Sequence, residues 1–234
     1  MFSKLLIVLY HTYNMFGQAI KIIFANFVDL IFPKEETIRK LEQMELGEIC
    51  SELVPAGNIS PYFKAVFSYK HPIARTAIWE IKYKANKKIL DKFSILLYEM
   101  MIEEISDILL FNGGQKLTLI PIPSTKNSQK EKGFNQSQLI VKKIYELDGG
   151  KNFDIDLNIL EKIKETPHQV KVKNRFERLK NLIGSFAVIN PEKVRGKNFI
   201  VIDDVITTGA TMTEASRALK VSGAKNVYGF SIAH

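Results

Sequence analysis

Cysteine is nearly missing from this sequence, since Cys50 is the only one among 234 residues. A single thiol excludes a disulfide within the chain, and it also excludes a zinc site built from several cysteines. A chain without disulfides is typical of a reducing compartment, so we expect a cytoplasmic location. The four histidines are too scattered along the chain to suggest a metal site in place of the missing cysteines.

Long apolar runs are also missing, although residues 1–32 are strongly apolar. The run that begins at Leu5 stops at His11, and Lys21 and Asp29 interrupt the next one. No run reaches the ~18 to 20 residues that a membrane-spanning helix needs, and no signal-peptide cleavage site follows. We therefore expect no stable membrane span, but two helical segments that pack on the body or on a partner. Contact with a membrane surface is the alternative.

Blocks of five or more like charges do not occur, which argues against a dedicated nucleic-acid-binding tail. The overall balance is nevertheless basic, with 33 Lys and Arg against 25 Asp and Glu and a net charge of +8. Such a balance suits nucleic acid or a small polyanion. The chain is 46% hydrophobic and 25% charged, which is ordinary for a soluble globular protein with one main domain and a small appendage.

Apolar runs that read as strands alternate with helical patterns between residues 117 and 234. This order predicts an α/β fold with a parallel sheet flanked by helices, and with ligands bound at the carboxyl ends of the strands. The predicted strands are 63–69, 117–122, 157–163, 186–188, 199–202 and 227–232. The predicted helices are 34–48, 73–83, 89–110, one that begins near Asn135, and 212–221.

The stretch from Asn198 to Met212 carries the strongest functional signal. Four apolar residues are followed by Asp203 and Asp204, which we expect to be exposed, and then by a small, hydroxyl-rich loop at the start of a helix. A helix amino terminus binds phosphate through free N–H groups and its dipole, and two adjacent acids suit a diol. Neither a Walker sequence nor a G-x-G-x-x-G fingerprint is present. A purely structural strand–turn–helix is the alternative interpretation.

This stretch resembles the phosphoribosyl-pyrophosphate (PRPP) signature of type I phosphoribosyltransferases. Three further stretches are similar to motifs of the ComF family: Lys132 to Gln136, Leu160 to Gln169, and Arg178 to Phe186. Lys132 and Lys162 stand where the family has arginine, and Lys82 with Tyr83 matches its Lys-Tyr pair. The family's cysteine-rich zinc module is missing after Phe32 and Pro33, where we expect a helix held by packing.

The resemblance implies a type I phosphoribosyltransferase-like sheet with a small hood, a subdomain that covers the carboxyl ends of the strands. It divides the chain into an amino-terminal helical extension and hood region at 1–60 and a phosphoribosyltransferase domain at 61–234. Asp203 and Asp204 are then the catalytic residues, which bind the ribose hydroxyls directly or through water on Mg²⁺. The loop that binds the 5-phosphate consists of Val205, Ile206, Thr207, Thr208, Gly209, Ala210 and Thr211.

A second loop would bind pyrophosphate, and its candidate residues are Ser124, Thr125, Lys126, Lys132 and Gly133. Without the resemblance, a solvated basic loop is the favoured interpretation of this stretch. A lid over the pyrophosphate is expected at 164–181, with Lys171, Arg175 or Arg178 as its cations. A structural ion pair for Arg178 and a surface role for His168 are the alternatives.

Two functions remain open at this point. The chain is either an enzyme that binds PRPP with Mg²⁺ and moves phosphoribose to or from an unidentified base or amine, or a non-catalytic PRPP- or nucleotide-binding accessory protein in DNA uptake. The resemblance implies PRPP or another ribose 5-phosphate compound as ligand and the DNA-uptake machinery as a partner, and it leaves a homodimer open. No motif names the acceptor.

Overall fold

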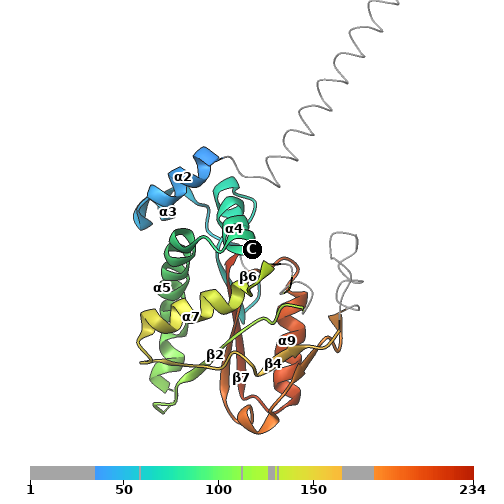
Figure 1. Ribbon diagram of the computed structural model, residues 1–234. Helices are drawn as coiled ribbons and strands as arrows, with labels where there is room; N and C mark the ends of the chain where they lie inside the picture. Colours follow the sequence, from blue (N-terminus) through green and yellow to red (C-terminus); the bar gives the residue numbers. More distant parts are fainter. Residues whose placement is uncertain (1–34, 58, 112, 126–129, 131, 165–181) are drawn as a thin grey trace, which may run out of the picture.

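Five parallel strands form the main sheet, in the order β1-β7-β6-β2-β3. The computed structural model in Figure 1 describes residues 35–57, 59–111, 113–125, 130, 132–164 and 182–234. The expectations for the first 34 residues and for the lid cations lie outside these ranges. The strands of this sheet are β1 (Phe63–Phe67), β2 (Leu117–Pro121), β3 (Phe153–Ile155), β6 (Asn198–Val205) and β7 (Asn226–Ala233).

Helices cover both faces of this sheet (Figure 1). Helices α4, α5 and α7 pack with Ile200 and Ile202 of β6 in one hydrophobic core. Helix α9 packs with Phe199 and Val201 in the other core. The four apolar residues therefore alternate between two cores, which is why this strand reads as a continuous apolar run. The helices are α2 (Glu35–Gln43), α3 (Leu46–Glu52), α4 (Pro72–Lys84), α5 (Lys87–Phe111), α7 (Gln136–Asp148) and α9 (Ala210–Val221), and a 3₁₀ turn covers Pro191–Lys193.

The prediction of a main-sheet strand at 157–163 is wrong. The strand beside β2 is β3, whose Phe153 pairs with Leu117 and packs edge-on against Tyr98 with ring centroids 6.5 Å apart. Residues 160–162 form β4 (Leu160–Lys162), which pairs antiparallel with β5 (Phe186–Val188) in a separate two-stranded sheet. This small sheet packs on the α9 side through Leu160 and Phe186, so the apolar residues near 160 serve the second core.

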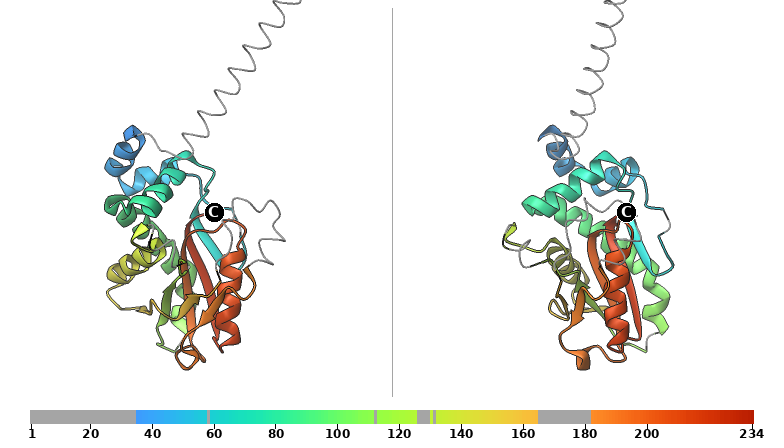
Figure 2. Two further views of the ribbon diagram at one scale, coloured as in Figure 1. Left: turned by 45° about the vertical axis from the view of Figure 1, so that its right-hand side comes forward. Right: turned by 90° about the vertical axis from the view of Figure 1, so that its right-hand side faces the viewer.

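The single helix predicted at 34–48 is two helices. The break falls at Glu45, because its side chain accepts from a backbone N–H of the first turn of α3, while Glu48 accepts from the Glu45 N–H at 2.8 Å. Leu41 and Met44 are buried in the first core, as the predicted helix face requires. In Figure 1 and in both views of Figure 2, α2 to α4 lie at the end of the sheet where β7 finishes.

None of the helices in the described ranges is both long and apolar enough to cross a membrane. The longest of these, α5, has 25 residues.

Gly229 on β7 offers a test of the packing between β1 and α9. A Cβ atom there would lie 2.8 Å from a ring carbon of Phe63 and 3.1 Å from the sulfur of Met212. We expect Gly229→Ala to lower the free energy of unfolding by about 1–3 kcal/mol, because the overfilled site forces its neighbours to move. Urea denaturation measures this change.

Gly47 is the matched control for that substitution. It is an exposed glycine inside α3 and has nothing within 4 Å of a built Cβ. Gly47→Ala should raise the free energy of unfolding by about 0.5–1 kcal/mol, because alanine favours the helix. Equal effects of the same sign in the two variants would contradict the packing that we describe at Gly229.

Candidate active site

The acid pair, Asp203 and Asp204, lies at the end of β6 and is buried. The exposed fractions of the two residues are 9% and 3%, so the expectation of exposed acids is wrong. The reason is that β6 continues to Val205 and is flanked by β2 and β7, with Asp203 opposite Ser231. The Asp203 Oδ1 atom accepts hydrogen bonds from the Ser137 hydroxyl at 3.0 Å and from the Asp204 N–H at 2.9 Å.

Two lysines compensate the charge of the acid pair. The Lys82 Nζ atom, in the last turn of α4, lies 3.7 Å from Asp204 Oδ2, and the neighbouring Asp204 charge raises the pKa of this lysine. Burial raises the pKa of Asp203 well above its usual range, and the Asp204 charge adds to that shift. Lys162 on β4 also interacts with the charge of Asp203, although burial lowers the pKa of its ammonium group. The buried acid pair thus has two lysines near it, Lys82 beside Asp204 and Lys162 acting on Asp203.

The predicted 5-phosphate loop ends at the amino terminus of α9, where the N-cap residue has no side chain and the Ala210 N–H makes one long contact, 3.4 Å, to Thr208 Oγ1. Gly209 is the N-cap of α9 and has φ = +75°, a left-handed conformation that favours glycine. The buried side chain of Ile206 anchors the loop, and its N–H donates to the Ala233 carbonyl at 2.9 Å. Thr207 is exposed, and Thr208 and Thr211 are partly exposed. The first turn of α9 has no acidic residue, so its N–H groups and dipole favour an anion.

The predicted pyrophosphate loop follows β2, the strand next to β6. Asn135 holds its far end: its side chain caps α7 by accepting from Ser137 N–H at 2.9 Å, and donates to the Ile122 carbonyl at 3.0 Å. The Ser124 hydroxyl oxygen is buried and has no hydrogen-bond partner among the described residues. Gly133 has φ = +78°, and Lys132 places its Nζ 4.8 Å from the ring centroid of Tyr83. Lys126 lies outside the described residues.

The predicted lid, apart from Lys164, also lies outside the described residues, and with it Lys171, Arg175 and Arg178. The stretches on either side of it are close together, because Lys164 Nζ donates to the Ile183 carbonyl at 3.3 Å. The second stretch is attached to α9 through the Gly184 N–H, which donates to Glu214 Oε1 at 2.7 Å. Arg217 holds the Glu214 carboxylate with two further hydrogen bonds of 2.7 Å.

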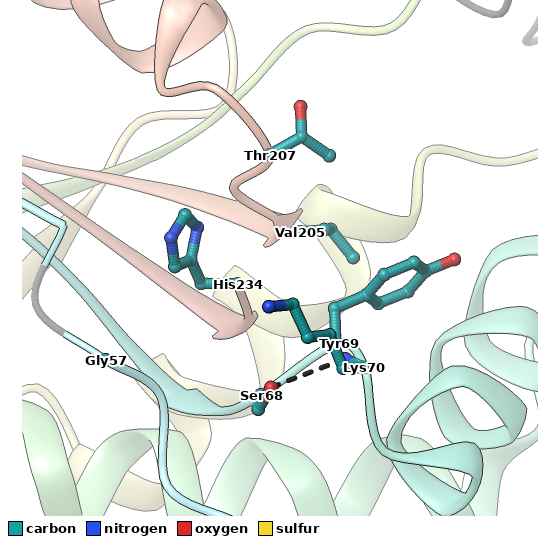
Figure 3. Close-up of a pocket in the computed structure, with 7 residues that line it drawn as sticks. All are labelled: Gly57, Ser68, Tyr69, Lys70, Val205, Thr207 and His234. Carbon is teal, nitrogen blue, oxygen red and sulfur yellow. Dashed lines mark hydrogen bonds between the residues drawn. The ribbon is translucent and has the colours of Figure 1, made fainter.

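A cavity of 420 Å³ adjoins the 5-phosphate loop (Figure 3). It lies where β1, β6 and β7 end. Two of the residues that line it, Val205 and Thr207, belong to the predicted 5-phosphate loop, and no motif indicated the other five. Four of its residues, including Tyr69, Lys70 and His234, directly follow β1 or β7. Ligands often bind where parallel strands end, so the position of these residues just after predicted strands is a sequence signal that could have identified them. The residues that line it are Gly57, Ser68, Tyr69, Lys70, Val205, Thr207 and His234.

Metal ligands are few in this site. No group of three or more His, Cys, Asp or Glu side chains in the described ranges could hold a metal ion. Asp203 and Asp204 are the acids available, and Asp204 Oδ2 is buried with no hydrogen-bond partner within the described part of the chain. This pair fits a cation that brings most of its oxygen ligands with it, such as Mg²⁺ on a phosphate.

The raised pKa of Asp203 predicts how stability depends on pH. The folded protein holds a proton on Asp203 over a range where the unfolded chain, with an aspartate pKa of about 3.9, has lost it. The stabilisation from this proton is complete below pH ~4 and is lost as pH rises through the folded pKa. We expect the unfolding free energy of the wild type, minus that of Asp203→Asn, to fall over this range and then level off. A difference that rises with pH would contradict the buried pair.

The chain is similar in sequence to several known proteins. Residues 137–231 match the phosphoribosyl transferase domain model. Competence protein ComFC of Bacillus subtilis is 26% identical over 170 residues, which cover 72% of this chain and 62% of that protein. Competence protein F of Haemophilus influenzae is 27% identical over 117 residues, or 49% of each chain. ComFC of Streptococcus pneumoniae is 34% identical over 116 residues, which cover 48% and 46%. The chain thus matches about half to three fifths of the length of these relatives.

Among solved structures, a glutamic acid mutant at an invariant aspartic acid in HPRTs matches with a TM-score of 0.38 and 9% identity, over 59% of this chain and 66% of that one. The parallel sheet and the domain match define an α/β protein with the type I phosphoribosyltransferase-like fold. Within that class, the chain is similar to the competence proteins ComFC and F, and its domain match is to the phosphoribosyl transferase domain.

Proposed function

We propose that this protein binds PRPP with Mg²⁺ and transfers phosphoribose to or from a base or amine. The observation that carries the proposal is the convergence of three elements at the carboxyl end of the sheet. These are the acid pair of β6, the amino terminus of α9 and the loop after β2. PRPP carries a diol, a 5-phosphate and a pyrophosphate, which are the three groups that these elements suit.

The acid pair would bind the ribose hydroxyls. Asp203 is held by Ser137 and Asp204 faces Lys82, so both carboxylates are fixed before a ligand arrives. Bond breaking at the anomeric carbon makes the sugar positively charged, and buried carboxylates stabilise that charge more strongly than acids in water do. PRPP is itself an anion, and Lys82 and Lys162 would reduce the repulsion between it and the acid pair.

The two loops would hold the phosphates. The N–H groups at the start of α9 would bind the 5-phosphate, with Thr207, Thr208 and Thr211 as hydroxyl donors. Ser124, Thr125, Gly133 and Lys132 would bind pyrophosphate, and Lys132 lies against the ring of Tyr83, the residue after Lys82. Mg²⁺ would neutralise phosphate charge, held by ligand oxygens and by water that the acid pair orients.

A non-catalytic role in DNA uptake is the second candidate, and the names of the relatives favour it. Two of them are called competence protein ComFC and a third competence protein F. Binding PRPP or a nucleotide without transferring phosphoribose would use the same acid pair and the same two loops. The two candidates therefore differ in turnover and not in binding.

Thermal unfolding with PRPP and Mg²⁺ tests the binding that both candidates share. At a hundredfold excess over Kd a ligand stabilises the folded state by about 2.7 kcal/mol, which raises Tm by roughly 5 to 10 °C in a chain of this size. Ribose 5-phosphate and pyrophosphate alone should give smaller shifts. No shift with millimolar PRPP and Mg²⁺ would reject the proposal. Release of pyrophosphate in an acceptor screen then separates the enzyme from the accessory protein.

A further inference from the structure

A chain of buried hydrogen bonds connects the base of the predicted pyrophosphate loop with the acid pair. The Asn135 amide donates to the Ile122 carbonyl at 3.0 Å and accepts from the Ser137 N–H at 2.9 Å. The Ser137 hydroxyl then donates to Asp203 Oδ1 at 3.0 Å. The exposed fractions of Asn135, Ser137 and Asp203 are 3%, 1% and 9%. Water therefore has little access to these bonds, and they are stronger than the same bonds at a surface.

This chain holds both ends of the loop. Ile122 comes just before the loop, where its N–H donates to the carbonyl of Ile202, the residue before Asp203, at 2.9 Å. Asn135 comes just after the loop and is the N-cap of α7, so its bond to Ile122 closes the loop at its base. Ser137 is in the first turn of α7, a helix whose apolar side chains are buried in the first core. Holding the base of the loop therefore also holds the hydroxyl that orients Asp203.

Ser137 and Asn135 act on other protein groups and not on a ligand. The Ser137 hydroxyl has a single hydrogen, which Asp203 accepts, and the residue is almost completely buried. The Asn135 amide uses its oxygen for the α7 N–H and its nitrogen for the Ile122 carbonyl. Any effect of these two side chains on ligand binding must therefore pass through Asp203 or through the loop.

A second set of contacts joins the same loop to the other acid, but it is more exposed. Lys132 Nζ lies 4.8 Å from the ring centroid of Tyr83, and the Nζ atom of the preceding residue, Lys82, lies 3.7 Å from Asp204 Oδ2. Tyr83 is 51% exposed, and a contact between a cation and an aromatic ring is weaker in water than in a dry site. The buried chain is therefore the stronger of the two connections.

We propose that Ser137 and Asn135 are positioning residues that couple pyrophosphate binding to ribose binding: bound pyrophosphate holds the loop, and the buried chain then holds Asp203 in the orientation that binds the ribose hydroxyls. This inference rests on the proposed binding of PRPP. Ordering the loop, the start of α7 and Asp203 costs free energy when the first ligand binds. The second ligand binds more tightly because this cost is not repeated, and the coupling is the same in either order of binding.

Calorimetric titration of ribose 5-phosphate, without and with saturating pyrophosphate and always with Mg²⁺, measures this coupling. The coupling factor is the Kd without pyrophosphate divided by the Kd with it. Repulsion between the two anions lowers the factor, but it lowers it equally in the wild type and in variants with the same charge. A general structural weakening changes both dissociation constants alike and leaves their ratio unchanged. The ratio of the coupling factors of two proteins therefore reports the buried chain.

Breaking the chain at either residue should reduce the coupling. We expect the factor to be at least about fivefold smaller in Ser137→Ala than in the wild type, which is the lower end of usual couplings between sites. Asn135→Ser should give a similar loss, because serine still caps α7 but is too short to reach the Ile122 carbonyl as well. The double variant should lose no more than either single one, because both substitutions break the same chain.

Ser94→Ala is the matched control. Ser94 is a fully buried serine of α5, and its hydroxyl oxygen has no hydrogen-bond partner within the described ranges. This variant should keep the wild-type factor. An unchanged factor in either Ser137→Ala or Asn135→Ser, or an equal loss in Ser94→Ala, would overturn the inference alone, since PRPP still raises Tm in the wild type. A wild type that PRPP does not stabilise rejects the proposed function, and the coupling with it.

Discussion

Asp203→Asn combined with Asp204→Asn should abolish most of the Tm shift that PRPP and Mg²⁺ produce. Each carboxylate lost from a charged hydrogen bond costs about 1.5–3 kcal/mol, so the affinity for PRPP should fall at least about a hundredfold. The shape of the site is kept, because the Oδ1 of asparagine still accepts from Ser137 and from the backbone of residue 204. Lys82 loses its partner, but its side chain is 35% exposed and water can solvate it. The free protein should therefore stay folded.

A matched pair of surface acids controls for the change in net charge. Asp107 and Asp154 are exposed, on α5 and β3, and replacing both by asparagine also removes two carboxylates. This control should retain the Tm shift, and calorimetric titration with PRPP should give an unchanged Kd. An equal loss of affinity in both double variants would mean that overall charge, and not the acid pair, binds the ligand. An unchanged shift in the site variant would reject the diol assignment.

Local signals in the sequence were enough to predict β6, the loop after it and α9. The four apolar residues, the acid pair and Gly209 lie within a dozen positions, and each restricts its own backbone directly. The burial of the acid pair could not be predicted in this way. It depends on Ser137, which is 66 positions from Asp203, and on Lys82, which comes from another helix. A pattern read along one strand does not contain such contacts.

Short elements account for the errors in the predicted fold. β3 has only three residues, and its place depends on Asp148, whose carboxylate accepts from the N–H groups of Asn152 and Phe153 at 2.8 and 3.1 Å. The apolar pattern near residue 160 is longer, and for that reason the sequence analysis predicted a strand there and missed β3. The break between α2 and α3 had a local signal that was missed, because Glu45 and Glu48 have the spacing of a capping box. His234 and Ile206 are 28 positions apart, and no motif joins them.

Gly209→Ala should weaken the binding of PRPP while the protein remains folded. A Cβ at this position would meet only Phe63, at 4.0 Å, so space is available and the cost is the left-handed backbone at φ = +75°. That strain is about 1–2 kcal/mol for a residue other than glycine. Relaxing it rotates the N–H groups that begin α9, and losing one charged hydrogen bond to phosphate costs about 1.5–3 kcal/mol, or a tenfold or greater loss of affinity.

Gly196→Ala separates the strain from the binding. Gly196 has φ = +73° and nothing within 4 Å of a built Cβ, so the substitution has the same backbone cost. It precedes β6, at the end of the sheet away from the acid pair, where its N–H donates to the Gly223 carbonyl at 2.8 Å. Urea denaturation should give similar losses of stability in the two variants, and titration with PRPP should show weaker binding only in Gly209→Ala. Equal affinities would mean that the 5-phosphate does not bind at the start of α9.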